Sequence, residues 1–115
     1  MRLFHLYKYI ISVVLVFFIV GCNTKSTETK RSVNYYKGEE VYRSVCISCH
    51  NADPRKPGPL GPQIAGADSL VLSSMILTGK PPKGVKPKWP DAEMAPLPHL
   101  EGQIPYLYEF LQAYK

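Results

Sequence analysis

The sequence predicts an all-α domain built from three to four short helices. Three segments carry apolar residues at the three- and four-residue spacing of an amphipathic helix, and no segment shows the alternation of a strand. Two proline-rich segments, 51–67 and 80–100, separate the helices and hold all of the 11 prolines except Pro105. A chain of 115 residues is long enough for one small domain.

Each expected helix has a recognisable end or apolar face. The first is expected over residues 34–45, with two glutamates near its start that favour the helix dipole. The second begins after Asp68, a favourable N-cap, and ends at Gly79, and the third tolerates Pro105 in its first turn. The apolar faces consist of Val41, Tyr42 and Val45, then Leu72, Met75 and Ile76, and finally Leu107, Phe110, Leu111 and Tyr114.

Residues 1–21 are typical of an export signal. Arg2 and Lys8 precede an apolar run over residues 10–20 that is about half the roughly 20 residues needed to cross a bilayer. The run ends at Gly21-Cys22, which resembles the bacterial lipoprotein signal, in which the chain is cut before a cysteine that receives a lipid. We expect Cys22 to anchor an exported protein to a membrane, facing the periplasm or the cell exterior. The alternatives are a secretory signal with an incidental cysteine and an uncleaved anchor.

Residues 22–33 are expected to form a flexible tether before a domain over 34–115, because residues 23–32 are all polar. Some 10 flexible residues span on the order of 17 Å, which would keep the domain close to the membrane. Removal of residues 1–21 leaves 12 Lys and Arg against 9 Asp and Glu, so the formal charge falls from +5 to +3. This charge is no nucleic-acid signature. The sequence also shows no nucleophile–base pair, phosphate loop or paired-carboxylate site that would indicate an enzyme.

Cys46-Ile47-Ser48-Cys49-His50 is the Cys-x-x-Cys-His signature of covalent haem c attachment. Two thiols at this spacing can form thioethers to one edge of a porphyrin, and the histidine then lies beneath the iron as its proximal ligand. The alternatives are a thioredoxin-like pair, which should follow a strand, and a zinc site, which needs two further ligands. A bound haem would also give the two long loops a surface to cover, in a domain otherwise poorly supplied with core.

Met94, in the second loop, is the candidate for the other axial position of the iron. Its neutral, soft sulfur would favour the ferrous state and raise the reduction potential. Met75 lies on an apolar helix face and is expected in the core. His99 is expected at the surface or beside a haem propionate. His99, or no protein ligand at all, is the alternative to Met94.

Over residues 35–114 these motifs resemble the small class I mono-haem cytochromes c. In that family a glycine and an aromatic residue stand eight and four residues before the first haem cysteine, as Gly38 and Tyr42 do here. The resemblance implies the cytochrome c fold wrapped around the haem. It also implies that the glycine lets the first helix cross the last closely, with Phe110 as the facing aromatic.

The family also carries a Gly-Pro-x-x-x-Gly segment whose proline carbonyl accepts a hydrogen bond from the haem histidine. Residues 61–66, which contain Pro62, resemble it, although a second Gly-Pro at 58–59 offers another register. Relatives often read Met-Pro at the distal ligand, whereas one alanine separates Met94 from the proline here.

Two further features of the second loop have both a functional and an ordinary interpretation. Trp89 is expected to pack on the haem or to donate its indole N–H to a propionate, and the alternative is ordinary burial beneath the loop. If the loop rims the haem edge, as the resemblance implies, its lysines would steer an acidic redox partner; otherwise they form a solvated loop. These lysines are Lys80, Lys83, Lys86 and Lys88.

The sequence therefore predicts a membrane-tethered carrier of single electrons with one haem c, whose iron is ligated by His50 and Met94 and alternates between Fe(III) and Fe(II). One alternative is an accessory haem subunit of a larger respiratory or metabolic enzyme. A second is a haem-based gas sensor, if Met94 is not the distal ligand. A third is a thiol or metal module without haem.

Overall fold

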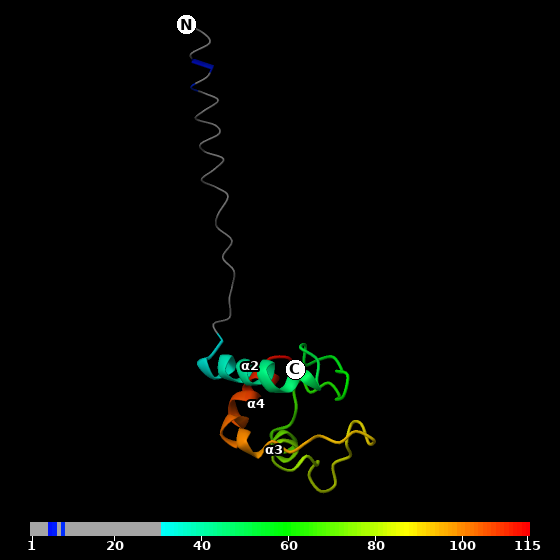
Figure 1. Cartoon of the computed structure of the whole chain (residues 1–115). Coiled ribbons are helices and arrows are strands. Elements are labelled where there is room, and N and C mark those ends of the chain that lie inside the picture. The colour runs from blue at the N-terminus through cyan, green and yellow to red at the C-terminus, as the bar shows by residue number, and fades with distance from the viewer. Residues whose placement is uncertain (1–4, 7, 9–30) are drawn as a thin grey trace.

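The computed structural model describes residues 5–6, 8 and 31–115, which are drawn as coloured ribbon in Figure 1. Cys22, most of the expected export signal and most of the expected tether lie outside the described residues. Within the described part of the chain, no helix is both long and apolar enough to cross a membrane.

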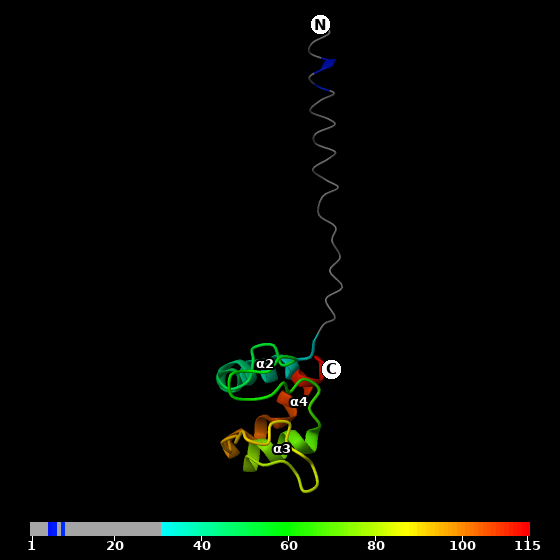
Figure 2. The same cartoon turned by 90° about the vertical axis from the view of Figure 1, so that its right-hand side faces the viewer.

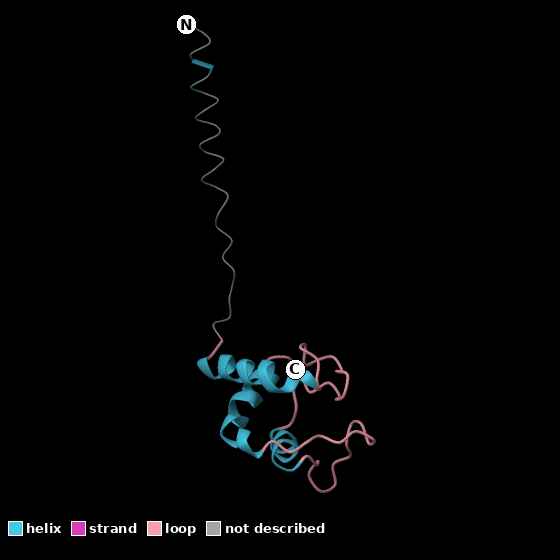
Figure 3. Cartoon of the chain, in the orientation of Figure 1, coloured by secondary structure: helices cyan, strands magenta, loops and turns pink. Residues whose placement is uncertain are grey.

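The described residues form a small helical domain. Its α-helices are α2 (Val33–Val45), α3 (Ser69–Thr78) and α4 (Ile104–Gln112), and two 3₁₀ helices, η1 (Cys46–Ser48) and η2 (Pro98–Gln103), precede the first loop and α4. Over residues 31–115 there is no strand (Figure 3). The all-α prediction and the three expected α-helices are confirmed, whereas the two 3₁₀ helices were not expected.

Local hydrogen bonds set the ends of α2 and α3. The hydroxyl oxygen of Ser32 accepts a hydrogen bond from the backbone N–H of Tyr35 at 3.0 Å. The Asp68 carboxylate accepts bonds from two backbone N–H groups in the first turn of α3. Gly79 ends the same helix in the left-handed conformation, with φ of 70°. These caps pair backbone groups that a helix end leaves without partners.

Helices α2 and α4 cross at Gly38. A Cβ atom at this position would overlap the carbonyl group of Tyr106 and would lie 2.9 Å from the Cβ of Phe110. Phe110 is fully buried, and its ring centroid lies 5.1 Å from that of Tyr42. The expected close crossing, with Gly38 facing Phe110, is therefore confirmed.

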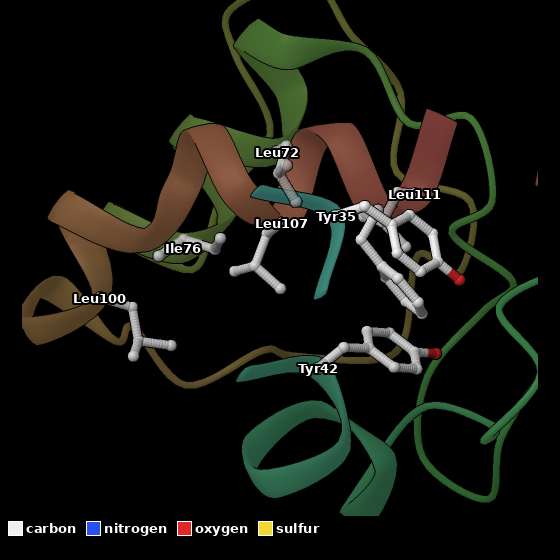
Figure 4. Packing of buried hydrophobic residues seen from close by; sticks show 8 residues of the cluster. Tyr35, Tyr42, Leu72, Ile76, Leu100, Leu107 and Leu111 are labelled. Atoms are coloured by element: carbon white, nitrogen blue, oxygen red, sulfur yellow. The ribbon is translucent and has the colours of Figure 1, made fainter. Parts of the chain in front are cut away.

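The core lies between α2, α4 and α3. It consists of eight buried residues (Figure 4): Tyr35, Tyr42, Leu72, Ile76, Leu100, Leu107, Phe110 and Leu111. Val41, Val45 and Tyr114 are half-buried against this cluster. Met75, expected in the core, is only half-buried.

The two long loops extend to the same side of the helices. In Figure 1 both run to the right, the loop after η1 above and the loop after α3 below. In Figure 2, which is viewed from that side, both loops spread in front of the helices. The residues proposed from the sequence as haem ligands lie on or beside these loops.

Candidate haem-binding site

The Cys-x-x-Cys-His segment begins where α2 ends. The chain passes directly from Val45 into η1, where the backbone N–H groups of Cys49 and His50 donate to the carbonyl oxygen of Cys46 at 3.2 and 2.8 Å. Both cysteines are free, Cys46 half-buried and Cys49 exposed. The turn therefore brings two thiols and one imidazole onto a single short piece of backbone.

The Cys46 thiol is poorly suited to thiol redox chemistry. Its burial, and to a smaller extent the neighbouring Cys49, raises the pKa of Cys46 to about 11. Reactive cysteines have a lowered pKa, because the thiolate is the nucleophile. The segment also follows a helix instead of a strand. Both observations disfavour the thioredoxin-like alternative.

The imidazole of His50 is oriented by a backbone carbonyl. Nδ1 lies 2.8 Å from the carbonyl oxygen of Pro62. A carbonyl oxygen can only accept, so Nδ1 carries the proton and donates. Nε2 makes no hydrogen bond to any residue that the structure describes. A backbone carbonyl holding one ring nitrogen and leaving the other without a protein partner is the arrangement typical of a metal-ligating histidine.

Two glycines let the first loop lie against this segment. A Cβ atom on Gly61 would come within 2.7 Å of Cε1 and 2.8 Å of Nδ1 of the His50 ring. A Cβ atom on Gly58 would lie 2.6 Å from the Cα of His50. The first Gly-Pro pair therefore covers the His50 backbone, and the second places its proline carbonyl at the ring. Of the two registers considered from the sequence, the structure brings Pro62 to the imidazole.

Tyr42 adds a contact that the sequence analysis missed. Its hydroxyl donates to the carbonyl oxygen of Asn51 at 2.5 Å, which joins α2 to the residue after His50. Burial raises the pKa of Tyr42 to about 12, so the phenol remains a neutral donor. The only signal for this role in the sequence was that the aromatic residue at this position is a tyrosine, which has a hydroxyl group, and not a phenylalanine.

Met94 lies on the second loop, half-buried against the core. A Cβ atom at Gly79 would overlap the carbonyl oxygen of Met94, so the loop passes close to the end of α3. Three residues further on, the Leu97 N–H donates to the Ile76 carbonyl oxygen at 2.6 Å. These contacts fix where the loop returns to the helices.

The other predicted residues are more dispersed. Trp89 is half-buried in the second loop, and His99 is exposed on η2, as expected for a surface residue. The four lysines of this loop are exposed, and Lys88 donates to the Gln63 carbonyl oxygen at 2.8 Å. The hydrogen bonds of the described residues join His50 to Pro62, but they join neither residue to Met94 or Trp89.

The described residues offer two thiols, an imidazole and a half-buried thioether, which are the groups that haem attachment and ligation use. Residues 31–115 contain no group of three or more His, Cys, Asp or Glu side chains placed to hold a metal ion. A structural zinc site requires four such ligands.

No protein-family model, curated protein or solved structure matches this chain.

Proposed function

We propose that this chain is an exported, membrane-tethered, mono-haem c-type cytochrome that carries single electrons between partner proteins. The observation that carries the proposal is the hydrogen bond from His50 to Pro62 within the Cys-x-x-Cys-His segment. It fixes the orientation of the imidazole and leaves Nε2 free to ligate the haem iron. A redox-active dithiol would not need a histidine held in this way.

The side chains then have distinct roles. Cys46 and Cys49 would hold haem c through two thioethers, and His50 and Met94 would be its axial ligands. When bound, the group supplies one-electron exchange between Fe(III) and Fe(II). The Pro62 carbonyl holds the ring and increases the basicity of Nε2 by accepting the Nδ1 proton. Because His50 and Met94 would both ligate the iron and leave no position for a substrate, we propose a carrier and not an enzyme.

We further propose that the helices adopt the cytochrome c fold and that both loops cover the haem. The loops leave the helices on one side (Figure 2). The half-buried residues of the second loop include Trp89 and Met94. A large apolar group between the loops would enlarge a core that, among the described residues, contains eight buried hydrophobic side chains.

The proposed location rests on the N-terminal segment of the sequence, and the proposed partner on the lysines of the second loop. We propose that residues 1–21 are removed, that Cys22 carries the lipid and that residues 22–33 tether the domain to the outer face of a bacterial membrane. Lys80, Lys83 and Lys86 are exposed on the second loop. They would attract an acidic redox partner over a distance set by ionic strength.

The test is to express the full chain, with its own export signal, together with a bacterial haem-attachment system. We expect the purified protein to gain the mass of one haem and, on reduction, to show the split α band of a c-type cytochrome. The double variant Cys46→Ala/Cys49→Ala should lose both signals. Cys22→Ser serves as the matched control, because it also removes a thiol but should keep the haem.

Other outcomes separate the alternatives. Absence of covalent haem from the wild type would refute the proposal and favour a thiol or metal module. Ready binding of carbon monoxide to the ferrous wild type would favour a gas sensor. Purification in a stoichiometric complex that resists high salt would favour a fixed subunit of a larger enzyme.

A further inference from the structure

The second loop is attached to the helices mainly at its two ends. At the start, the hydroxyl of Ser74 donates to the Lys80 carbonyl oxygen at 2.8 Å. At the end, the Leu97 N–H donates to Ile76. Between these points the backbone hydrogen bonds are local, from Val85 to Pro82 at 3.0 Å and from Ala92 to Trp89 at 3.3 Å. Such a segment needs a further contact if its middle is to stay in place.

One contact of this kind is present. The ammonium group of Lys88 donates to the carbonyl oxygen of Gln63 at 2.8 Å, across 25 residues of sequence. Within residues 81–96 it is the one hydrogen bond that reaches another part of the described chain. We call this contact the loop bridge.

The loop bridge joins the two segments that carry the expected iron ligands. Gln63 directly follows Pro62, whose carbonyl holds His50, and this segment is itself anchored by hydrogen bonds from Ile64 and Ala65 to Pro54 at 2.9 and 3.0 Å. Lys88 lies six residues before Met94 on the second loop. The loop bridge therefore connects the loop that carries Met94 to the anchored segment whose Pro62 carbonyl holds His50.

We propose that Lys88 is a positioning residue: it holds the second loop closed so that Met94 stays on the iron and small external ligands are kept out. This inference rests on the proposed function, and it assigns one lysine of the basic stretch to the site itself instead of to partner docking. The long side chain of lysine suits this role, because it can reach from one loop to the other while the two backbones stay apart.

The chain provides a matched control for the charge. Lys86 is exposed on the same loop and makes no hydrogen bond to the described residues. Lys86→Met and Lys88→Met therefore remove the same charge and the same donor groups, but only the second removes the bridge. Lys88→Arg keeps a long cationic donor and should restore it.

The first measurement is amide hydrogen exchange of the full, processed protein. In Lys88→Met, exchange of the Val85 and Ala92 amides should increase about twofold to tenfold, as expected for loss of a single hydrogen bond. Lys86→Met should leave these rates unchanged, and Lys88→Arg should return them toward the wild-type values. If these two amides exchange at equal rates in Lys86→Met and Lys88→Met, the loop bridge does not hold the loop. This result applies whether or not the protein carries haem.

The second measurement follows the replacement of Met94 by imidazole in the oxidised haem protein, through loss of the sulfur-to-iron charge-transfer band. Replacement should be faster in Lys88→Met than in Lys86→Met by a similar factor. If the loop amides exchange faster in Lys88→Met but imidazole replaces Met94 no faster, Lys88 is not a positioning residue. The loop bridge is then a structural contact only. Failure of the proposed function is separate, because it would appear as absence of covalent haem from the wild type.

Discussion

At the scale of single residues, His50 is oriented by a carbonyl oxygen that accepts its Nδ1 proton and by a glycine that leaves room for its ring. The Pro62 carbonyl fixes the Nδ1 proton, and the absent side chain of Gly61 leaves room for the ring. The Cys-x-x-Cys-His spacing and the Gly-Pro pair are local signals, so these residues could be identified from the sequence. The choice between the two Gly-Pro registers could not, because it depends on how the first loop folds back over residues 49 and 50.

Replacing Gly61 with alanine tests this fit. The new methyl group would lie 2.7 Å from Cε1 of His50, so the ring or the loop must move. We expect a loss of about 1–3 kcal/mol in the free energy of unfolding, typical of overpacking, together with a lower yield of haem protein. Urea unfolding measures the first quantity and the ratio of haem to protein the second.

Gly102→Ala is the matched control, because a Cβ atom there meets no atom within 4 Å. If both alanine variants unfold at the same urea concentration as the wild type, the described contact between Gly61 and the ring is wrong.

Met94 supports a second residue-scale prediction. Met94→Ala should abolish the sulfur-to-iron charge-transfer band of the oxidised protein and lower its reduction potential, because the soft sulfur that favours ferrous iron is gone. Optical spectra and a redox titration measure both effects. Met75→Ala should keep the band, since Met75 lies half-buried on α3. An unchanged spectrum in Met94→Ala would point to His99 as the distal ligand.

At the scale of elements, the α-helices could be predicted because their signals are local. Asp68 and Gly79 mark the ends of α3, and apolar spacing marks α4. The 3₁₀ helices η1 and η2 could not be predicted, since short segments of this kind have no apolar period to detect. The Ser32 cap was missed because its neighbours are polar and resemble a tether. The loop bridge was missed because nothing near Lys88 in the sequence indicates Gln63.

The crossing of α2 and α4 gives an element-scale prediction. In Gly38→Ala the added methyl group would overlap the Tyr106 carbonyl group, and the two helices would have to separate. We expect a net loss of roughly 2 kcal/mol in the free energy of unfolding, after the small gain in helix propensity that alanine brings. Glu40→Ala, on an exposed position of the same helix, should change stability little. Urea unfolding measures the stability of both variants. Equal stability of Gly38→Ala and Glu40→Ala would contradict the close crossing of the two helices.

At the scale of the whole molecule, a small helical domain is predicted to follow a lipid anchor. The fold class could be predicted because three segments of the domain show helical periodicity and none shows the alternation of a strand. The path of the loops could not, because it is set by contacts between residues far apart in the sequence, such as Tyr42 with Asn51 and Lys88 with Gln63.

The anchor is tested on the full chain. Cys22→Ser should remove all incorporation of labelled fatty acid and release the protein from the membrane fraction, because the serine cannot form the thioether through which the lipid is attached. Radiolabelling and fractionation measure this. Ser32→Ala, in the same region of the sequence, should keep the label. Continued labelling of Cys22→Ser would refute the assignment of the anchor.

The crossing at Gly38 also constrains when the domain can fold. Helix α2 lies at the start of the domain, yet the surface that covers it is Phe110 and its neighbours on α4, more than sixty residues later in the chain. A chain that emerges from a membrane channel with its N-terminus first cannot complete this pairing until α4 has also emerged. Until then α2 lacks the surface that it packs against, so an exported chain would complete this crossing only at the end of translocation.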